Sequence, residues 1–286
     1  MQSKEWPYGE SVTETSKVGS LIIIGGAEDK KNEQVILKEF VRMSGSEKAK
    51  IVIMTVATEL PEEVGSEYIK IFKALMGDQA SVITVDVESR EQANSPEAIA
   101  HIEDATGVFF TGGDQFRITR LLGGTKLDTA LHDRYDQGLI LAGTSAGASM
   151  MSSIMIIQGP AETTAKIGMT RLGAGMEFLS GVIIDQHFAQ RGRINRLLTA
   201  IAQYPHHLGI GIDENTALIV EGHMCRVVGE GSITVLDAGE VRDGIPTKEE
   251  SDDNLAICDV KLHLLPTGHG FDLRNRTPVF KAKSED

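Results

Sequence analysis

The chain has 286 residues, and its 41% hydrophobic and 24% charged content is ordinary for a soluble globular protein that can bury a full core. A formal net charge of −13 argues against nucleic acid or an anionic membrane as the main partner. Two cysteines are too few for a disulfide framework, and residues 1–20 contain no apolar stretch typical of a secretory signal, so a cytoplasmic location is expected.

Apolar runs alternate with amphipathic segments through the first half of the chain. After a polar segment at 1–18, expected to be a flexible lead-in, strands are predicted at 21–24, 51–54, 82–85, 108–110 and 139–141. Helices are predicted between them, at about 33–43, 62–76, 96–104, 116–122 and 126–137. This alternation is typical of a parallel sheet buried on both faces, which binds ligands at the carboxyl ends of its strands.

The second half has a different pattern. Residues 158–175 are rich in Gly, Ala and Thr and predict a loop that could border a site, before a strand at 182–184 and a helix at about 191–203. Short runs separated by Gly turns predict a mixed-sheet extension, with strands at 208–212, 217–220, 225–228 and 232–236. An acidic loop at 242–254, a final strand at 255–265 and a polar tail are expected to follow. No internal repeat or long linker is visible, so residues 19–286 are predicted to form a single α/β domain.

The fifth apolar run leads into Gly143-Thr144-Ser145-Ala146-Gly147, and a small-residue segment of helical character follows. A strand, a tight turn flanked by glycines and a helix are the context of a nucleophile elbow. Ser145 Oγ is then expected to project from the sheet as a nucleophile, with the Ala146 N–H facing a developing oxyanion. The simpler alternative is a Gly-rich turn that contains a serine.

A serine nucleophile needs a base, and the base needs an orienting acid. His187 follows the strand at 182–184, on the same sheet edge as Ser145 if the strands are parallel. Asp213 and Glu214 follow the strand at 208–212, and on placement alone either could orient His187 or be merely solvated. Gly113, in the turn after the fourth strand, is a candidate second oxyanion donor, although a plain turn explains it equally well.

Two further motifs carry charge. Arg191, Arg193 and Arg196 open a helix, where cations oppose the helix dipole. Arg193 and Arg196 are three residues apart and could clamp a carboxylate, the alternative being a solvated charged face. The segment 25–30, Gly-Gly-Ala-Glu-Asp-Lys, lacks the ending of a phosphate loop, so a cation contact or a structural turn is expected there.

The order and spacing of five motifs resemble the cyanophycinase family. They are Gly25–Lys30, Thr111–Gln115, Gly143–Ala148, Asp185–Phe188 and Gly211–Glu214. Cyanophycinases are similar to aspartyl dipeptidases (peptidase E), and they share a three-layer α/β/α fold with class I glutamine amidotransferases. The resemblance therefore implies a flavodoxin-like sandwich with a mostly parallel central sheet and a mixed-strand C-terminal extension. Amidotransferases carry a cysteine at the elbow, where this chain has Ser145.

The resemblance also implies an activity. Such an enzyme is a serine exopeptidase that cuts cyanophycin, a poly-aspartate with an arginine on each β-carboxyl, into β-Asp-Arg dipeptides. Ser145 would be the nucleophile, His187 the base and Glu214 the acid. The implied substrate pocket consists of Gln115, Asp185, Gln186, Arg193 and Arg196. No metal or cofactor is implied, and a homodimer is suggested. The lead-in, residues 159–173 and the segment after about 236 match the family poorly.

Three other functions stay open. An aspartyl dipeptidase or related isopeptidase would use the same triad on a different substrate. An α/β-hydrolase esterase has the chain order Ser, acid, His, and would use Ser145 with Asp237 and either His263 or His269. A non-catalytic binding protein would only have kept the turn.

Overall fold

The computed structural model describes residues 18–77, 80–160, 164–241 and 253–281. Its largest sheet has nine strands in the order β15-β14-β11-β10-β1-β5-β4-β2-β3. Five neighbouring strands are parallel: β1 (Leu21–Ile24), β5 (Ile140–Thr144), β4 (Gly107–Phe110), β2 (Lys50–Met54) and β3 (Ser81–Val85). The helices between them are α1 (Val35–Met43), α2 (Pro61–Met76), α3 (Pro96–Glu103), α4 (Gln115–Leu122) and α5 (Lys126–Asp136). The predicted α/β alternation is confirmed.

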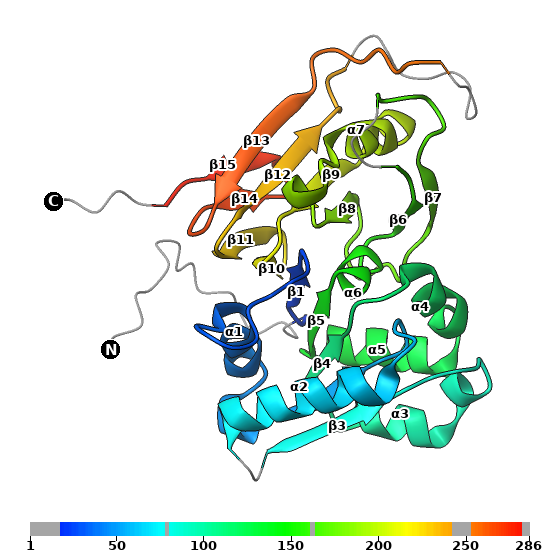
Figure 1. Ribbon diagram of the computed structural model, residues 1–286, viewed down its shortest axis with the longest axis vertical. Helices are drawn as coiled ribbons and strands as arrows, with labels where there is room; N and C mark the ends of the chain where they lie inside the picture. Colours follow the sequence, from blue (N-terminus) through cyan, green and yellow to red (C-terminus); the bar gives the residue numbers. More distant parts are fainter. Residues whose placement is uncertain (1–17, 78–79, 161–163, 242–252, 282–286) are drawn as a thin grey trace, which may run out of the picture.

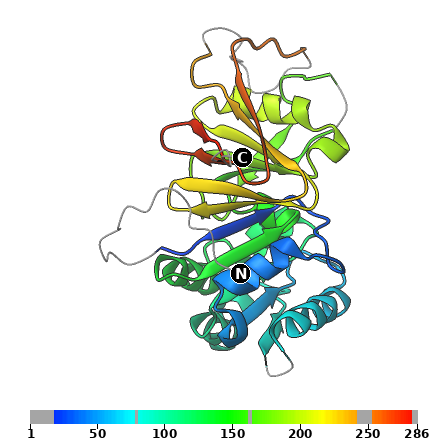
Figure 2. The same ribbon diagram turned by 90° about the vertical axis from the view of Figure 1, so that its left-hand side faces the viewer.

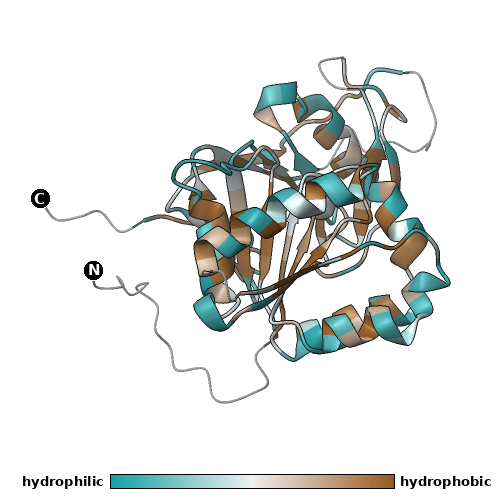
Figure 3. Cartoon of the chain, turned by 60° about the horizontal axis from the view of Figure 1, so that its bottom comes forward, coloured by the Kyte–Doolittle hydropathy of each residue, from teal (hydrophilic) through white to brown (hydrophobic). Residues whose placement is uncertain are grey.

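The inner parallel strands β1, β2, β4 and β5 are almost entirely buried because both faces of the sheet are covered there, whereas the edge strand β3 exposes Ser81, Ile83 and Thr84. Side chains alternate between the faces of a strand, so Ile22 and Ile24 pack with α1 and α2. Leu21 and Ile23 belong to the core on the other face, together with residues of α3, α4 and α5. Figure 3 shows the apolar strands inside the molecule and the hydrophilic sides of the helices outside. This is the predicted three-layer arrangement.

The second half of the chain builds the rest of the large sheet and two smaller sheets. Antiparallel strands extend the large sheet beyond β1: β10 (Thr216–Glu221), β11 (Met224–Gly229), β14 (Gly270–Asp272) and β15 (Thr277–Val279). A separate four-stranded sheet contains β8 (Val182–Gln186), β9 (Leu208–Ile212), β12 (Ser232–Asp237) and β13 (Lys261–Pro266). α7 (Ile194–Gln203) packs on its face through apolar residues. Figures 1 and 2 show this sheet and α7 above the parallel strands.

Several predicted boundaries are corrected. The segment 158–175 is not all loop, because β7 (Arg171–Ala174) pairs with β6 (Ile154–Gln158). The last predicted strand begins only at Lys261, and the tail contains β14 and β15. The helix expected from 191 starts at Ile194, because Gly192 adopts a φ of +58° after a short 3-10 turn. After the elbow, α6 (Ala146–Ser149) is a single short turn.

The structure describes little of two segments that the sequence predicts to be irregular. The lead-in at 1–18 lies outside the described residues except for Val18, and so does most of the acidic loop at 242–254. In the part of the chain that the structure describes, no helix is both long enough and apolar enough to cross a membrane.

Candidate active site

The turn after β5 has the backbone of a nucleophile elbow. Ser145 has φ +53° and ψ −106°, a conformation that L-residues rarely adopt and that surrounding structure must enforce. A Cβ on Gly143 would lie 2.1 Å from the Gly147 carbonyl oxygen, and a Cβ on Gly147 would lie 2.5 Å from the Phe110 carbonyl oxygen. Both glycines are therefore needed for the close packing of this turn, as the sequence indicates.

Ser145 lies at the start of a chain of three polar side chains. The His187 Nε2 is 3.1 Å from Ser145 Oγ, and the His187 Nδ1 is 2.6 Å from Glu214 Oε1. This is the arrangement of a nucleophile, a base and an orienting acid. The competing candidate Asp213 has a different task, since its carboxylate accepts hydrogen bonds from the Ala189 N–H and from Ser232.

The three side chains come from two different sheets, so the expected common sheet edge is wrong. Ser145 follows β5 in the nine-stranded sheet. His187 and Glu214 follow β8 and β9, which are parallel neighbours in the four-stranded sheet with Gln186 opposite Ile212. The hydrophobic pattern identifies these segments as strands but does not show which strands pair with each other. The expectation of a single edge assumed that all of these strands belong to one parallel sheet.

The loop after β1 joins the two sheets at the site. The Gly25 carbonyl accepts a hydrogen bond from the His187 N–H at 2.8 Å, and the Gly26 carbonyl accepts one from the Asn215 N–H at 2.9 Å. Asn215, with φ +47°, also accepts from the Asp29 N–H through Oδ1 at 2.8 Å. Sequence reasoning predicts a structural turn here but misses Asn215, whose one available signal is that asparagine tolerates left-handed backbone.

Gly26 sets the space available to the imidazole ring. Its φ is +95°, and a Cβ on it would lie 2.3 Å from His187 Cε1. Gly26→Ala is therefore expected to push the ring away from Ser145 and to lower kcat/KM by about 10²-fold, the effect of a misplacement of about 1 Å. Steady-state kinetics checks this. Gly222→Ala is the matched control, because Gly222 has φ +65° and nothing within 4 Å of its added Cβ. Equal activity of the two variants would contradict the steric role.

The turn at 111–115 also reaches the nucleophile. A Cβ on Gly112 would lie 3.4 Å from Ser145 Cβ, so the two backbones are in close contact. Gly113 has φ +144°, and the Asp114 N–H that follows it donates to the Ala57 carbonyl at 2.9 Å. The turn is thus fixed beside the elbow. Gly113 and Ala146 as oxyanion donors stay a prediction.

The predicted pocket arginines are buried against Asp185. Arg196 donates to both Asp185 carboxylate oxygens, through Nε at 2.8 Å and through Nη2, and Arg193 Nη1 lies 3.4 Å from Oδ1. Both arginines are only 7% exposed, so a solvated charged face is wrong. Burial lowers the pKa of Arg193 to about 10. The carboxylate that the two arginines hold in this structure is the protein's own.

Two other predicted pocket residues join this network to neighbouring parts. Gln186 Oε1 lies 3.4 Å from Ser145 Oγ and accepts from Arg193 Nη1 at 3.1 Å. Gln115 Nε2 donates to the carbonyls of Ile156 and Ile157 at 2.9 and 3.0 Å. Gln115 therefore holds the end of β6 beside the site. Whether these residues contact substrate stays a prediction.

The residues of the esterase alternative have other partners. Asp237 Oδ1 is ion-paired with Arg276 at 2.6 Å. The rings of His263 and His269 lie beside Phe271 and Phe280, with centroids 5.4 and 5.8 Å apart. The histidine that Ser145 contacts is His187, so the geometry favours the order Ser, His, Glu.

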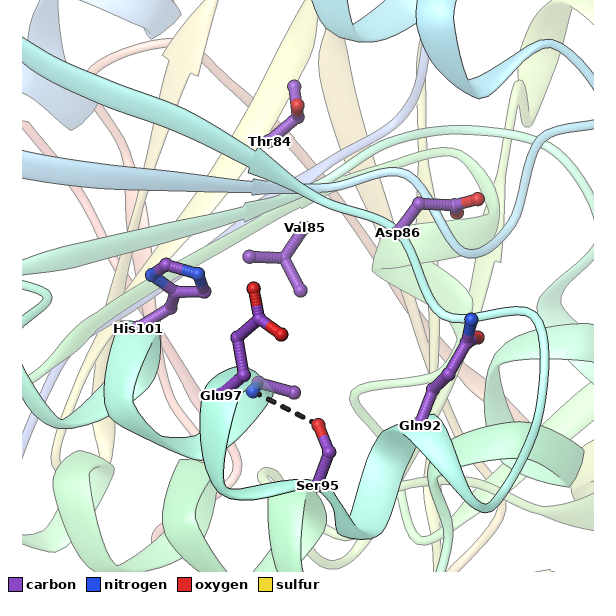
Figure 4. Close-up of a pocket in the computed structure, with 8 residues that line it drawn as sticks. Thr84, Val85, Asp86, Gln92, Ser95, Glu97 and His101 are labelled. Carbon is purple, nitrogen blue, oxygen red and sulfur yellow. Dashed lines mark hydrogen bonds between the residues drawn. The ribbon is translucent and has the colours of Figure 1, made fainter.

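A hollow away from these residues is shown in Figure 4. It lies at the carboxyl end of β3, three strands from β5, and is lined by Thr84, Val85, Asp86, Gln92, Ser95, Glu97, Ala98 and His101. Ser95 Oγ accepts from the Ala98 N–H at 3.2 Å and so caps α3. The hollow shares no residue with the Ser145 site.

Comparison with known proteins decides the family. Residues 21–228 match peptidase family S51. The chain belongs to peptidase family S51. It is a serine-type peptidase.

Two cyanophycinases and one solved peptidase structure match most of the chain. A cyanophycinase of Trichormus variabilis is 36% identical over 260 residues, which are 90% of this chain and 87% of the relative. A cyanophycinase of Geminocystis herdmanii is 34% identical over 91% of this chain and 96% of the relative. The crystal structure of a peptidase from an acI-B1 Actinobacterium superposes with a TM-score of 0.65 at 20% identity, covering 90% of this chain and 98% of that one. The last comparison shows the shared fold.

Proposed function

We propose that this S51 peptidase is a cyanophycinase that releases β-Asp-Arg dipeptides from cyanophycin. The proposal rests on one combination: Ser145, His187 and Glu214 are hydrogen-bonded in sequence, in a chain that is 36% identical to a cyanophycinase over 90% of its length. In this proposal residues 19–286 act as one catalytic domain, because the three proposed catalytic side chains follow strands of both sheets.

The proposed mechanism follows from the positions of the three side chains. Ser145 Oγ attacks the scissile carbonyl carbon while His187 Nε2 accepts its proton. Glu214 holds the imidazole through Nδ1–H and stabilises the imidazolium that forms. The Gly113 and Ala146 N–H groups are the proposed oxyanion donors. His187 then protonates the leaving amine, and water hydrolyses the acyl-enzyme by the same proton transfers in reverse.

Substrate recognition is proposed to use the network next to Ser145. Gln115, Asp185, Gln186, Arg193 and Arg196 form the proposed pocket wall. Gln186 is the member that lies against the nucleophile, since its Oε1 is 3.4 Å from Ser145 Oγ. In this proposal a substrate carboxylate shares Arg193 or Arg196 with Asp185, because both arginines are already paired with that carboxylate.

One digestion tests the function. Purified protein is incubated with insoluble cyanophycin, and soluble β-Asp-Arg is quantified by mass spectrometry. Release of this dipeptide is expected. No release, together with cleavage of α-Asp dipeptides, would assign the chain to the aspartyl dipeptidase activity instead.

The pH dependence should report His187. Burial of the ring lowers the pKa of His187 below its ordinary value of 6.5, the nearby Arg191 cation lowers it further, and Glu214 opposes both. A base must be neutral, so kcat/KM on a short soluble oligomer is expected to fall with decreasing pH through a midpoint below 6.5. Glu214→Gln should move the midpoint to still lower pH, because Glu214 raises the pKa. A midpoint above 6.5, or an upward shift in the variant, would contradict this assignment.

The proposed cytoplasmic location and the proposed homodimer each rest on one observation. Cys225 and Cys258 are both free, which fits the reducing cytoplasm. β13 is an edge strand that exposes Leu262 and Leu264 at 57% and 62%, and it is a candidate contact for the proposed homodimer.

A further inference from the structure

A buried carboxylate lies directly behind the elbow. Glu28 is 5% exposed, and both of its oxygens accept hydrogen bonds from hydroxyl groups. Thr144 Oγ1 donates to Oε2 at 2.5 Å, and Tyr68 Oη donates to Oε1. Thr144 and Tyr68 are themselves 4% and 2% exposed. Glu28 thus connects the loop after β1 with α2 and with the last residue of β5.

Burial at this position costs the Glu28 carboxylate much of its hydration free energy. A buried ionised group needs partners to offset its lost hydration. Lys30, two residues away, forms its ion pair with a different carboxylate. Its Nζ pairs with Glu67 at 2.8 Å and lies 4.3 Å from the centroid of the Tyr68 ring. Burial and the nearby Glu28 charge raise the pKa of Tyr68 well above 10, so its hydroxyl keeps its proton and remains a donor.

Glu28 acts on the residue that precedes the nucleophile. Ser145 holds its φ of +53° only if the surrounding structure enforces it. The Ser145 N–H donates to the Ile24 carbonyl at 3.0 Å, which fixes one side of the turn. The Glu28–Thr144 hydrogen bond fixes the side chain one residue earlier. The end of β1 and the loop after it therefore contact the elbow at two consecutive residues, and the loop also holds the His187 backbone through Gly25.

We propose that Glu28 is a positioning residue, which fixes Ser145 against His187 through its hydrogen bond to Thr144. This inference rests on the proposed catalytic role of Ser145 but not on the identity of the substrate. The hydrogen bond from Thr144 transmits the position of the carboxylate to the nucleophile, whereas the hydrogen bond from Tyr68 serves to satisfy the other buried oxygen.

The decisive comparison is between two substitutions at one position. Thr144→Val removes the hydroxyl but keeps the branched shape, whereas Thr144→Ser keeps the hydroxyl. Each variant is treated with a fluorophosphonate, which bonds to Ser145 Oγ through phosphorus and releases fluoride, and the labelling rate is measured by mass spectrometry. Thr144→Val is expected to label 10- to 100-fold more slowly, with a parallel fall in kcat and a KM within about twofold. Thr144→Ser should keep at least a third of the wild-type rate.

Tyr68→Phe separates positioning from loss of stability. It also removes one hydrogen bond to Glu28, but on the side away from Ser145. Its melting temperature should fall as far as that of Thr144→Val, while its labelling rate falls less than threefold. Glu28→Ala should add little to the labelling defect of Thr144→Val, since both break the same link.

Three results would overturn the proposal: wild-type labelling of Thr144→Val, equal labelling defects in Thr144→Val and Tyr68→Phe, or no rescue by Thr144→Ser. A wild-type protein that the probe does not label would instead reject Ser145 as the nucleophile. A labelled protein that leaves cyanophycin intact would reject only the proposed substrate.

Discussion

Replacement of Ser145 by alanine is expected to lower kcat/KM for β-Asp-Arg release by at least about 10⁴-fold. The expected loss is this large because the covalent route depends on Oγ, and the base and acid have no nucleophile to serve without it. The measurement is dipeptide release at high enzyme concentration, with the folded state verified by circular dichroism.

Ser152→Ala is the matched control for this loss. Ser152 is also buried, and its hydroxyl has two carbonyl acceptors within hydrogen-bond distance, those of Ser149 at 3.1 Å and Ile154 at 2.7 Å. It therefore loses buried hydrogen bonds seven residues from Ser145 without touching the triad, and its activity should stay within a few-fold of wild type. Substantial turnover by Ser145→Ala would contradict the assignment of Ser145 as the nucleophile.

The second large effect concerns stability. Asp185→Asn leaves Arg193 and Arg196 buried without the carboxylate that neutralises them. Removing one partner of a buried ion pair destabilises a protein by roughly 3–5 kcal/mol. The free energy of unfolding from urea denaturation should fall by this amount.

An exposed ion pair provides the control, because the same Asp-to-Asn change there should hardly alter the free energy of unfolding. Asp104 pairs with Lys50 at 2.9 Å and is 81% exposed, so Asp104→Asn should change the free energy of unfolding by less than about 1 kcal/mol. Similar losses in the two variants would show that Asp185 has no special structural task. If Asp185 also binds substrate, the folded fraction of Asp185→Asn will show a raised KM.

The parallel half of the fold is predictable because its strands are mostly apolar runs and its helices are amphipathic. These are local signals, and β1 to β5 follow them closely. β7 is different: it contains Gly173 and Ala174 and becomes a strand by pairing with β6 across an intervening loop. Its stabilisation is non-local, so sequence periodicity contains little trace of it.

The site shows the same division. The elbow is recognisable because Gly143 and Gly147 are required by local packing. The arginine motif signals an unusual environment but not its content: a carboxylate clamp is expected, and Asp185 from the same chain occupies it. Glu28 has no sequence pattern beyond a carboxylate after a Gly-Gly turn, since its partners Tyr68 and Thr144 are 40 and 116 residues away.

The division of the triad between two sheets has a consequence for biosynthesis. A growing chain that has exposed the elbow still lacks the base and its acid, which are 42 and 69 residues further along. The triad therefore needs residues from three distant parts of the chain, held together by the pairing of β8 with β9 and by the hydrogen bonds from His187 and Asn215 to the loop after β1, so it cannot assemble before residue 214 has been synthesised.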